Sequence, residues 1–338
     1  MKTGLCSVSF RKLTVEEIIA AVKEAGLDGI EWGGDVHVPH GDVEKAKYVA
    51  KLMEEAGLET LSYGTYYYPG DHAVEDFKGV IDCALALGTK IIRVWAGSKT
   101  LPEVTAEYRA KIIADTQALC DMAKPYGLTV AYEYHGWTLT ETLESALQAY
   151  EEVNKENMKM YWQPSIFKTA DENMEALKAL LPYSCNLHMF HWDQEYTRYA
   201  LEDGADTVKR YLDLAKTNPQ IRSVMMEFIK DDSIEQMKAD AAILNKLAKG
   251  EIKKQQVLST RCFFDQFFSF FQKCVQCVLG VGNLQYRLLH GADAVTLAVD
   301  DVIGQNIIRA GDVMQIKNLF GGAAHNTAMH AADTCQNK

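Results

Sequence analysis

The sequence has little positive charge and no long apolar run. Its 338 residues include 35 Lys and Arg against 46 Asp and Glu, giving a formal net charge of −11, and the basic residues form no cluster. We therefore expect no nucleic-acid partner and no attraction to anionic membranes. No stretch of about 18 apolar residues predicts a membrane helix, because the densest candidate, residues 257–281, is interrupted by Arg261, Asp265 and Lys273.

Signals of secretion and of structural zinc are also missing. The first ten residues contain no long apolar segment and no cleavage pattern. The eight cysteines are scattered. The lone C-x-x-C, Cys274 to Cys277, lacks the second pair of ligands that a zinc site needs. We expect reduced thiols and a cytoplasmic location.

The sequence does contain a repeated unit in which a helix ends at glycine and a short strand follows. The segments Glu24–Trp32 and Glu55–Tyr63 share the pattern E-A-G-L, and Ala86–Trp95 and Pro125–Glu133 follow the same plan. Glycine suits the left-handed position that ends a helix. A repeat of about 30 residues has the length of one strand-plus-helix unit.

Eight predicted strands alternate with helices along the first 250 residues. Helix starts are predicted where Thr or Ser precedes an acid or amide by three residues, at Thr14, Thr100, Thr138 and Ser233. Strict alternation predicts a parallel sheet, and eight units predict a (β/α)8 TIM barrel. An open doubly wound sheet is the alternative, but no G-x-G-x-x-G follows the first strand. The predicted strands are Leu5–Phe10, Gly29–Trp32, Thr60–Tyr63, Ile91–Trp95, Thr129–Glu133, Met158–Trp162, Ser184–His188 and Ser223–Glu227.

The repeated pattern stops near Gly250. We expect a barrel over residues 1–249 and an atypical C-terminal extension over residues 250–338. The extension contains no proline and includes an aromatic run, Phe263–Phe271. It is either a poorly ordered appendage, which we favour, or a helical extension that packs on the barrel.

Four polar residues stand at the carboxyl ends of adjacent predicted strands, where barrels of this kind carry their chemistry. Glu133 ends the fifth strand, Gln163 follows the sixth, His188 ends the seventh and Glu227 ends the eighth. Alternation along each strand points all four inward. Taken singly, each is explained as well by a salt bridge or a hydrogen bond. Together, two carboxylates, an imidazole and an amide oxygen suit Mn²⁺, Mg²⁺ or Co²⁺, so we expect a divalent-metal site.

Residues 1–249 also resemble the xylose isomerase-like TIM barrels, the sugar phosphate isomerase and epimerase superfamily. The resemblance implies a divalent metal held by Glu, Asp, His and Glu on strands five to eight, and Glu133, His188 and Glu227 match three of these positions. The chain departs from the family at Gln163, where Asp is usual, and at Ile166, where His is usual. The motifs that carry the resemblance are Gly29–His37, Tyr63–Tyr67, Glu133–His135, His188–His191 and Met226–Asp232.

The resemblance implies an isomerase or epimerase acting on a small sugar or sugar phosphate. Glu133 and Glu227 would be the catalytic pair that moves a proton next to a carbonyl, through an enediolate, while the metal polarises the substrate oxygens. Two alternatives stay open. One is a metal-dependent lyase or dehydratase on an oxidised sugar or inositol derivative. The other is a non-catalytic carbohydrate-binding barrel in which Gln163 and Ile166 have weakened the metal site. The family also includes DNA-repair endonucleases, but these need more His and carboxylate ligands and a basic groove. This acidic chain lacks both, so we do not expect that activity. Barrels of this kind often pair, so a homo-oligomer is a further expectation, although no residue marks an interface.

Six further residues beside the strand ends are expected to contact the substrate. His37 is a candidate hydrogen-bonding group or second base, and Arg93 is expected to pair with Glu133 or with a substrate oxyanion. His135 and His191 would also orient the metal ligands. Trp95 offers an aromatic face that suits contact with a sugar ring. The six candidates are Glu31, His37, Arg93, Trp95, His135 and His191.

Overall fold

The structure is a computed structural model that describes residues 1–249, 286–291 and 294–299. The chain divides into two units, Met1–Ile252 and Lys253–Lys338. Of the second unit, one antiparallel pair of strands is described, β9 (Tyr286–Gly291) and β10 (Ala294–Val299). The aromatic run and the Cys274–Cys277 pair lie outside the described residues. The boundary expected at residue 250, and the choice between a helical and a poorly ordered extension, stay predictions.

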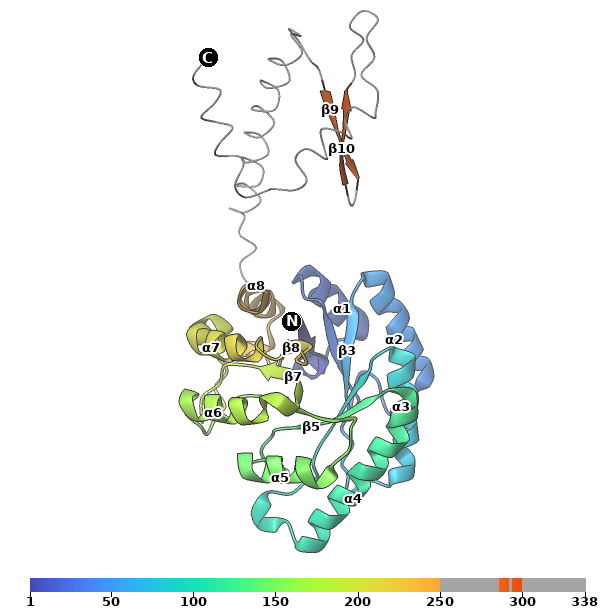
Figure 1. Ribbon diagram of the computed structural model, residues 1–338, viewed down its shortest axis with the longest axis vertical. Helices are drawn as coiled ribbons and strands as arrows, with labels where there is room; N and C mark the ends of the chain where they lie inside the picture. The colour runs from blue at the N-terminus through green and yellow to red at the C-terminus, as the bar shows by residue number, and fades with distance from the viewer. Residues whose placement is uncertain (250–285, 292–293, 300–338) are drawn as a thin grey trace, which may run out of the picture. The chain divides into compact units, whose positions relative to one another are not determined.

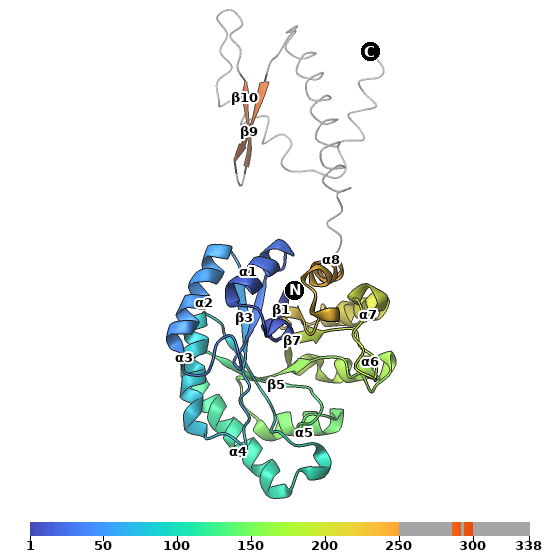
Figure 2. The same ribbon diagram turned by 180° about the vertical axis from the view of Figure 1, so that it is seen from behind.

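Eight parallel strands close into a barrel in the first unit, because β1 pairs with β8 as well as with β2. Helices α1 to α8 surround the strands, as Figures 1 and 2 show from opposite sides. The TIM barrel predicted from the sequence is confirmed. The strands are β1 Lys2–Cys6, β2 Gly29–Gly33, β3 Glu59–Gly64, β4 Ile91–Val94, β5 Thr129–Glu133, β6 Met158–Trp162, β7 Ser184–Met189 and β8 Ser223–Met226; the helices are α1 Val15–Glu24, α2 Val43–Ala56, α3 Phe77–Leu87, α4 Ala106–Ala123, α5 Leu143–Val153, α6 Ala170–Leu180, α7 Ala205–Ala215 and α8 Ile234–Lys249.

Glycine ends the repeated units for the reason that the sequence suggests. Gly57 and Gly88 are the C-caps of α2 and α3, with φ of 71° and 75°, and Gly127 ends the short turn after α4 with φ of 65°. These left-handed angles are strained for any residue with a Cβ. The strand that follows begins two or three residues after each of these glycines, at Glu59, Ile91 and Thr129, so the predicted starts of these strands fall close to the observed ones.

Two of the four predicted helix caps are wrong. Thr14 forms both hydrogen bonds of a capping box with Glu17, and Ser233 accepts a hydrogen bond from the backbone of Gln236. Thr100, in contrast, precedes the 3-10 helix Leu101–Glu103 without forming a side-chain cap, and Thr138 precedes a loop. The helices α4 and α5 start later, and their caps are Thr105 and Thr142.

Glu141 explains why the Thr100 and Thr138 signals mislead. Its carboxylate accepts hydrogen bonds from the Thr100 hydroxyl, at 2.7 Å, and from the backbone of Leu101, at 2.9 Å. It therefore joins the loop after β4 to the loop after β5. The Thr138 hydroxyl donates to the carbonyl of His135 instead of capping a helix.

The first strand is shorter than predicted and starts earlier. It spans Lys2–Cys6, and residues Ser7–Phe10 form a 3-10 turn. Ser7 holds this turn against β2, because its hydroxyl accepts a hydrogen bond from the backbone of Gly33 at 2.8 Å. The alternating apolar residues after Cys6 resemble a strand, but they are buried from the turn, with Val8 in the barrel interior and Phe10 in the core between strands and helices.

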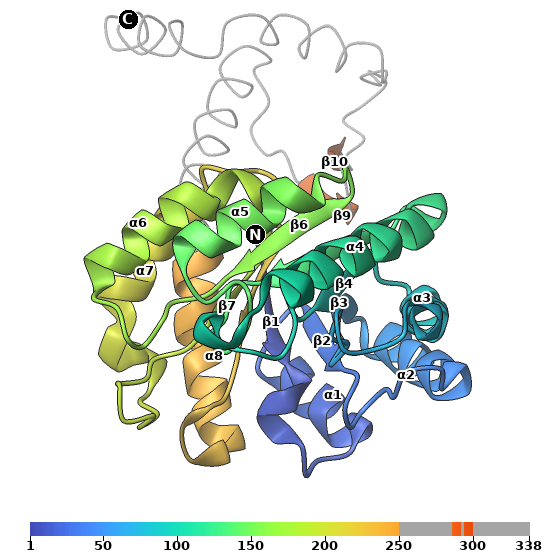
Figure 3. The ribbon, with the colours of Figure 1, turned by 90° about the horizontal axis from the view of Figure 1, so that it is seen from below.

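Apolar side chains form two layers on the two sides of the strands. Between strands and helices lies a large core that includes Val130 and Tyr132 of β5. A small cluster fills the barrel interior, and Ala131 and Tyr161 belong to it. Figure 3, which views the molecule from below, shows the helices ringed around the strands. Inward residues above the interior cluster are polar, so the upper half of the barrel is the part that can carry chemistry. Within the described residues, no helix is both long enough and apolar enough to span a bilayer.

Candidate metal centre

Three of the four predicted metal ligands meet at the carboxyl ends of β5, β7 and β8. The His188 Nδ1 atom lies 2.9 Å from Glu133 Oε1 and 3.5 Å from Glu227 Oε2. One ligand atom from each of the three residues lies within 4.8 Å of the other two. All three side chains are buried. Such a cluster has the size and the donor types of a site for one divalent cation.

The backbone fixes Glu227 although it lies one residue beyond β8. Its N–H donates to the carbonyl of Met189 at 3.2 Å, which continues the β7–β8 pairing by one step. The chain then turns at Phe228, which has a left-handed φ of 51°. The Phe228 N–H donates to the Ser9 hydroxyl at 2.8 Å. Left-handed backbone at a bulky residue is strained and persists only where neighbouring contacts enforce it.

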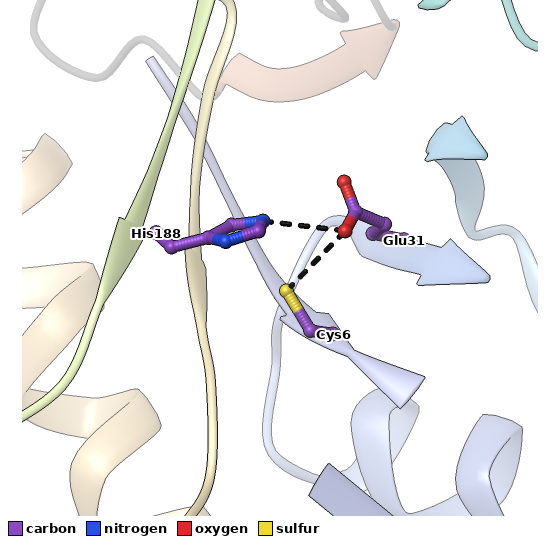
Figure 4. Close-up of side chains that lie close together, drawn as sticks. All are labelled: Cys6, Glu31 and His188. Atoms are coloured by element: carbon purple, nitrogen blue, oxygen red, sulfur yellow. Dashed lines mark hydrogen bonds and ion pairs between the residues drawn. The ribbon is translucent and has the colours of Figure 1, made fainter. Parts of the chain in front are cut away.

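A second group of side chains surrounds Glu31, on β2 beside the predicted ligands. Glu31 Oε1 lies 3.2 Å from His188 Nε2, 3.0 Å from Arg93 Nε and 3.8 Å from Cys6 Sγ. Figure 4 shows the His188 ring and the Cys6 sulfur facing this one oxygen. The other oxygen, Oε2, accepts a hydrogen bond from the Ser62 hydroxyl at 2.7 Å. Glu31 is therefore engaged on both oxygens.

Gly64, at the end of β3, leaves the space that this group needs. A Cβ at this position would lie 2.6 Å from Glu31 Oε1 and 2.7 Å from Arg93 Nη2. Arg93 also donates through Nη1 to Glu133 Oε2. The guanidinium thus bridges the carboxylates of β2 and β5, and the pairing of Arg93 with Glu133 that the sequence suggests is present.

The charges of this cluster do not balance within the described residues. Three buried carboxylates, Glu31, Glu133 and Glu227, face the one guanidinium of Arg93. With a neutral His188, two negative charges remain, which equals the charge of one divalent cation. Buried charge without a partner is costly.

The pKa shifts show the same imbalance. Burial would raise the pKa of Glu133, but the charges of Arg93 and His188 outweigh burial and lower it to about 2. Burial raises the pKa of Glu227, and the charge of His188 only partly opposes this. Burial would lower the pKa of His188, but the surrounding Cys6 and carboxylates raise it well above its usual value. Without a cation, the surrounding carboxylates therefore favour the protonated form of His188.

Gln163, the fourth predicted ligand, is placed differently. It follows β6, lies buried, and its Oε1 atom has no hydrogen-bond partner. An amide oxygen without a partner in the interior is costly. The strand order puts β6 between β5 and β7, so an ion beside Glu133 and His188 is the natural partner for it. The donor set, the residual charge and this unpaired oxygen together fit a divalent cation.

Three of the six candidate substrate contacts lie inside the protein. Glu31 and Arg93 have 1% of their surface exposed, and His37 has 3%. The ring nitrogens of His37 lie 3.0 Å from the Ser7 hydroxyl and 3.2 Å from the Leu13 carbonyl, so both are already engaged. The substrate contacts assigned to these three residues stay predictions, and their observed partners are protein groups.

Trp95 and His135 lie nearer the surface, above Arg93. The Arg93 guanidinium lies 5.9 Å from the centre of the Trp95 ring, and the Trp95 and His135 rings are 4.5 Å apart. The exposed Trp137 ring follows, 5.9 Å from His135. Its backbone has a left-handed φ of 59°. These rings lead from the ion cluster to solvent and suit contact with a ligand.

His191 lies on the other side of the cluster, after β7. Its ring is 5.5 Å from that of Tyr199. A cavity beside it is lined by Glu227, His191, Phe190, Tyr199 and residues of the loop after β8. His191 therefore borders the same space as Glu227, although no hydrogen bond joins the two side chains among the contacts of the described residues.

Cys6, Ser62 and Gly64 belong to the site but are not found from the sequence. Cys6 lies opposite Glu31 in the β1–β2 pairing, and Ser62 lies opposite Glu31 in the β2–β3 pairing. Inward-facing polar residues on two neighbouring strands, here Glu31 and Ser62, are the signal that would have indicated Ser62. The register between strands decides which residues meet, and single-strand patterns do not give that register.

Comparison with known proteins agrees with this architecture. A family model described as xylose isomerase-like TIM barrel matches residues 19–217. A 3-dehydroshikimate dehydratase from Bacillus anthracis is 25% identical over 200 residues, which cover 56% of this chain and 71% of that protein. The structure of a 3-keto-D-glucoside 4-epimerase from E. coli matches with a TM-score of 0.59 and 20% identity, over 74% of this chain and 99% of that one.

A xylose isomerase-like TIM barrel protein from Mycobacterium smegmatis, solved in complex with magnesium, matches with a TM-score of 0.58. It is 16% identical, and the match covers 74% of this chain and 97% of that one. At these identities the two solved structures establish a shared fold alone.

Proposed function

Because the chain belongs to the xylose isomerase-like TIM barrel family, we propose that it is a divalent-metal-dependent isomerase or epimerase. Its substrate would be a sugar or sugar phosphate, and the reaction would move a proton at the carbon next to a carbonyl. The observation that carries the proposal is the charge of the buried cluster, in which Glu31, Glu133 and Glu227 face one guanidinium. Family members with known activities include an epimerase and a dehydratase.

Glu133, His188, Glu227 and the Gln163 oxygen would hold the cation. When bound, Mn²⁺, Mg²⁺ or Co²⁺ would polarise the substrate carbonyl and stabilise the negative charge that develops on its oxygens. The His188 Nδ1 atom faces both glutamates, so its lone pair is the one placed to bind. The cluster would then be neutral, because the cation supplies the two positive charges that Arg93 alone does not provide.

The two glutamates would move the proton. One carboxylate takes the proton from the carbon next to the carbonyl, which gives an enediolate, and the other returns a proton to the same or the neighbouring carbon. Glu133 is fixed by Arg93, whereas Glu227 has His188 as its ion-pair partner and borders an open cavity. Trp95, His135 and His191, which border the cluster, would contact the sugar.

Solvent-deuterium incorporation tests this proposal directly. Purified protein loaded with Mn²⁺ is incubated in D₂O with a panel of ketoses and keto-sugars, and exchange is followed by NMR. Glu133→Gln and Glu227→Gln should each lower exchange by about 10²–10⁴-fold, the usual contribution of a positioned acid or base. Glu151→Gln, on the exposed side of α5, is the matched control and should behave as wild type.

Metal content is measured for every variant, so that loss of the metal ion is not mistaken for loss of the residue that carries the proton. Near-normal exchange by either glutamate variant, or exchange without metal, would exclude the proposal.

A lyase or dehydratase is the second candidate, because a 3-dehydroshikimate dehydratase is the relative that matches over 71% of its length. The same removal of a proton next to a carbonyl would then be followed by loss of a β-hydroxyl as water. Oxidised sugars, inositol derivatives and 3-dehydroshikimate are the test substrates, and the product is recognised by the ultraviolet absorbance of its new conjugated double bond. Metal binding without exchange or elimination on any substrate would favour the third reading, a carbohydrate-binding barrel.

A further inference from the structure

Glu31 is a buried carboxylate of the cluster that has no role in the proposed reaction. It lies on β2, beside His188, and it is 1% exposed. Neither a substrate nor solvent reaches it without displacing protein groups. Its partners are Arg93, Ser62, Cys6 and His188.

His188 stands between two carboxylates, one at each ring nitrogen. Nδ1 lies 2.9 Å from Glu133 Oε1, and Nε2 lies 3.2 Å from Glu31 Oε1. The Nε2 contact is within ion-pair distance, and Nε2 has no hydrogen-bond partner among the described residues. If Nδ1 donates its lone pair to a cation between Glu133 and Glu227, the ring proton must be on Nε2. The carboxylate closest to that proton is then Glu31.

We propose that Glu31 is a positioning residue, which accepts the Nε2–H of His188 and so directs Nδ1 toward the cation. This inference rests on the proposed metal site. A carboxylate behind a ligating histidine fixes the tautomer and the ring orientation and makes the imidazole a stronger ligand. Glu31 can do this because it cannot turn away. Ser62 holds its Oε2 at 2.7 Å, and Arg93 Nε holds its Oε1 at 3.0 Å.

A second metal ion at Cys6, Glu31 and His188 is the competing interpretation. One ligand atom from each lies within 4.8 Å of the others, and Figure 4 shows how they converge. However, the guanidinium of Arg93 already contacts the same Glu31 oxygen. A cation there would lie beside a permanent positive charge, and like charges in a buried site repel strongly. We therefore favour a single ion, bound on the Nδ1 side of His188, over two ions.

Metal titration of the full chain tests the inference without a substrate. Chelator-treated wild type, Glu31→Gln and Thr116→Val are titrated with Co²⁺ and followed by visible absorption. We expect one ion per chain in all three proteins, and affinity lowered by about 10–100-fold in Glu31→Gln, the usual effect of removing such a partner. Thr116→Val removes a buried hydroxyl of α4 that forms a hydrogen bond with Tyr132, on the helix side of the strands. It controls for a general loss of stability and should bind as wild type.

The His188 ring proton gives a readout that a purely structural role would not change. In the Co²⁺ protein, the Nε2–H proton should appear as a strongly shifted, exchangeable NMR signal. It should exchange slowly with solvent in wild type and faster in Glu31→Gln. Ser62→Ala, which frees one Glu31 oxygen but keeps the carboxylate, should weaken binding in the same direction to a smaller extent. It also keeps the test usable should Glu31→Gln fail to fold.

The outcomes separate this inference from the proposed function. Equal affinity and equal exchange in Glu31→Gln would overturn the positioning role and leave the enzyme proposal standing. Metal binding as expected, but with no proton transfer on any sugar, would overturn the enzyme proposal and leave the role of Glu31 standing. Two ions per chain, one of them lost in Cys6→Ser, would replace the positioning role by a second metal site. A wild-type protein that binds no ion would overturn both proposals.

Discussion

At the scale of single residues, Arg93 holds the buried cluster together. Its guanidinium contacts Glu31 through Nε and Glu133 through Nη1, and all three side chains are 1–2% exposed. Because Arg93, Glu31 and Glu133 are shielded from solvent, removing one of these charges leaves another buried charge unpaired. The site thus depends on a residue that need not touch the substrate.

Arg93→Leu should destabilise the metal-free protein by about 3–5 kcal/mol, the usual cost of removing one partner from a buried ion pair. The physical reason is that Glu31 and Glu133 lose their shared cation. Urea unfolding followed by circular dichroism measures the effect. Arg210→Leu, which removes an exposed ion pair with Asp171, should leave the midpoint unchanged. An equally stable Arg93→Leu protein would show that the pair is not formed in solution.

Gln163→Leu should weaken metal binding by at least about tenfold, comparable to the loss of a supporting ligand group. Leucine has a similar volume and removes the oxygen that lacks a protein partner. The affinity is measured by Mn²⁺ or Co²⁺ titration. Gln148→Leu, on the exposed face of α5, is the control. Unchanged affinity in Gln163→Leu would mean that the amide is not a ligand.

Residue patterns indicate part of this cluster and miss the rest for a physical reason. Glu133, His188 and Glu227 are predictable because parallel strands end at a common edge and side chains alternate along each strand. Cys6 and Ser62 join the cluster only through the pairing of β1, β2 and β3. That pairing is a property of the closed barrel, and no single strand contains it.

At the scale of helices and strands, the seam of the barrel is held by side chains as well as by the β1–β8 pairing. Asp28, just before β2, accepts a hydrogen bond from the backbone of Thr3 at 2.8 Å. Lys249, the last residue of α8, lies 2.8 Å from the same carboxylate oxygen. Asn245 accepts a hydrogen bond from the Thr3 hydroxyl at 2.7 Å. The final helix is thus tied to the first strand.

Asp28→Asn should lower stability by about 1 kcal/mol or less at neutral pH, since a third of the side chain is exposed and solvent screens its charge. Burial would raise the pKa of Asp28, but Lys249 and Thr3 outweigh it, so the pKa in the folded protein is lowered. The stabilisation is therefore complete above the unfolded pKa of about 4 and is lost as the pH falls through the lower folded value. Urea unfolding of both proteins from pH 7 to pH 3 should show their difference shrinking below about pH 4. A difference that grows as the pH falls would contradict this assignment.

Local signals are reliable for strand starts and less reliable for helix starts. The glycines require left-handed angles that few other residues adopt, so they mark helix ends strongly. Thr100 and Thr138 have the spacing of a capping box, but Glu141 bonds across two loops instead. A capping signal depends on which partner the acid finds in the folded chain, and that partner is not local.

At the scale of the whole molecule, the barrel is complete within the first unit. All eight strands and the helix after each one lie before residue 250, and β1 and β8 close the sheet. Eight repeated units suffice to predict this, because a parallel sheet of eight strands with a helix after each has one common closed form. The repeat ends with α8, so no comparable pattern predicts the fold of residues 250–338.

Truncation after Gly250 should leave the melting temperature, the metal affinity and the exchange activity as in the full chain. The reason is that every strand, every site residue and the Lys249–Asp28 contact are retained. Differential scanning calorimetry and Co²⁺ titration of both proteins measure this. A shorter form ending after Ala215 removes β8, Glu227 and α8 and is the positive control for damage. A large loss in the Gly250 form would show that the extension belongs to the folded barrel.

The pairing of β1 with β8 also sets an order of events during synthesis. Lys2–Cys6 is made before both of its neighbouring strands, and one of them, Ser223–Met226, follows some 220 residues later. At about 5–20 residues per second, the nascent chain spends roughly 10–45 s with that edge uncovered. An uncovered strand edge recruits other chains, so translation speed and chaperone supply should govern how much of the newly made protein reaches its native form.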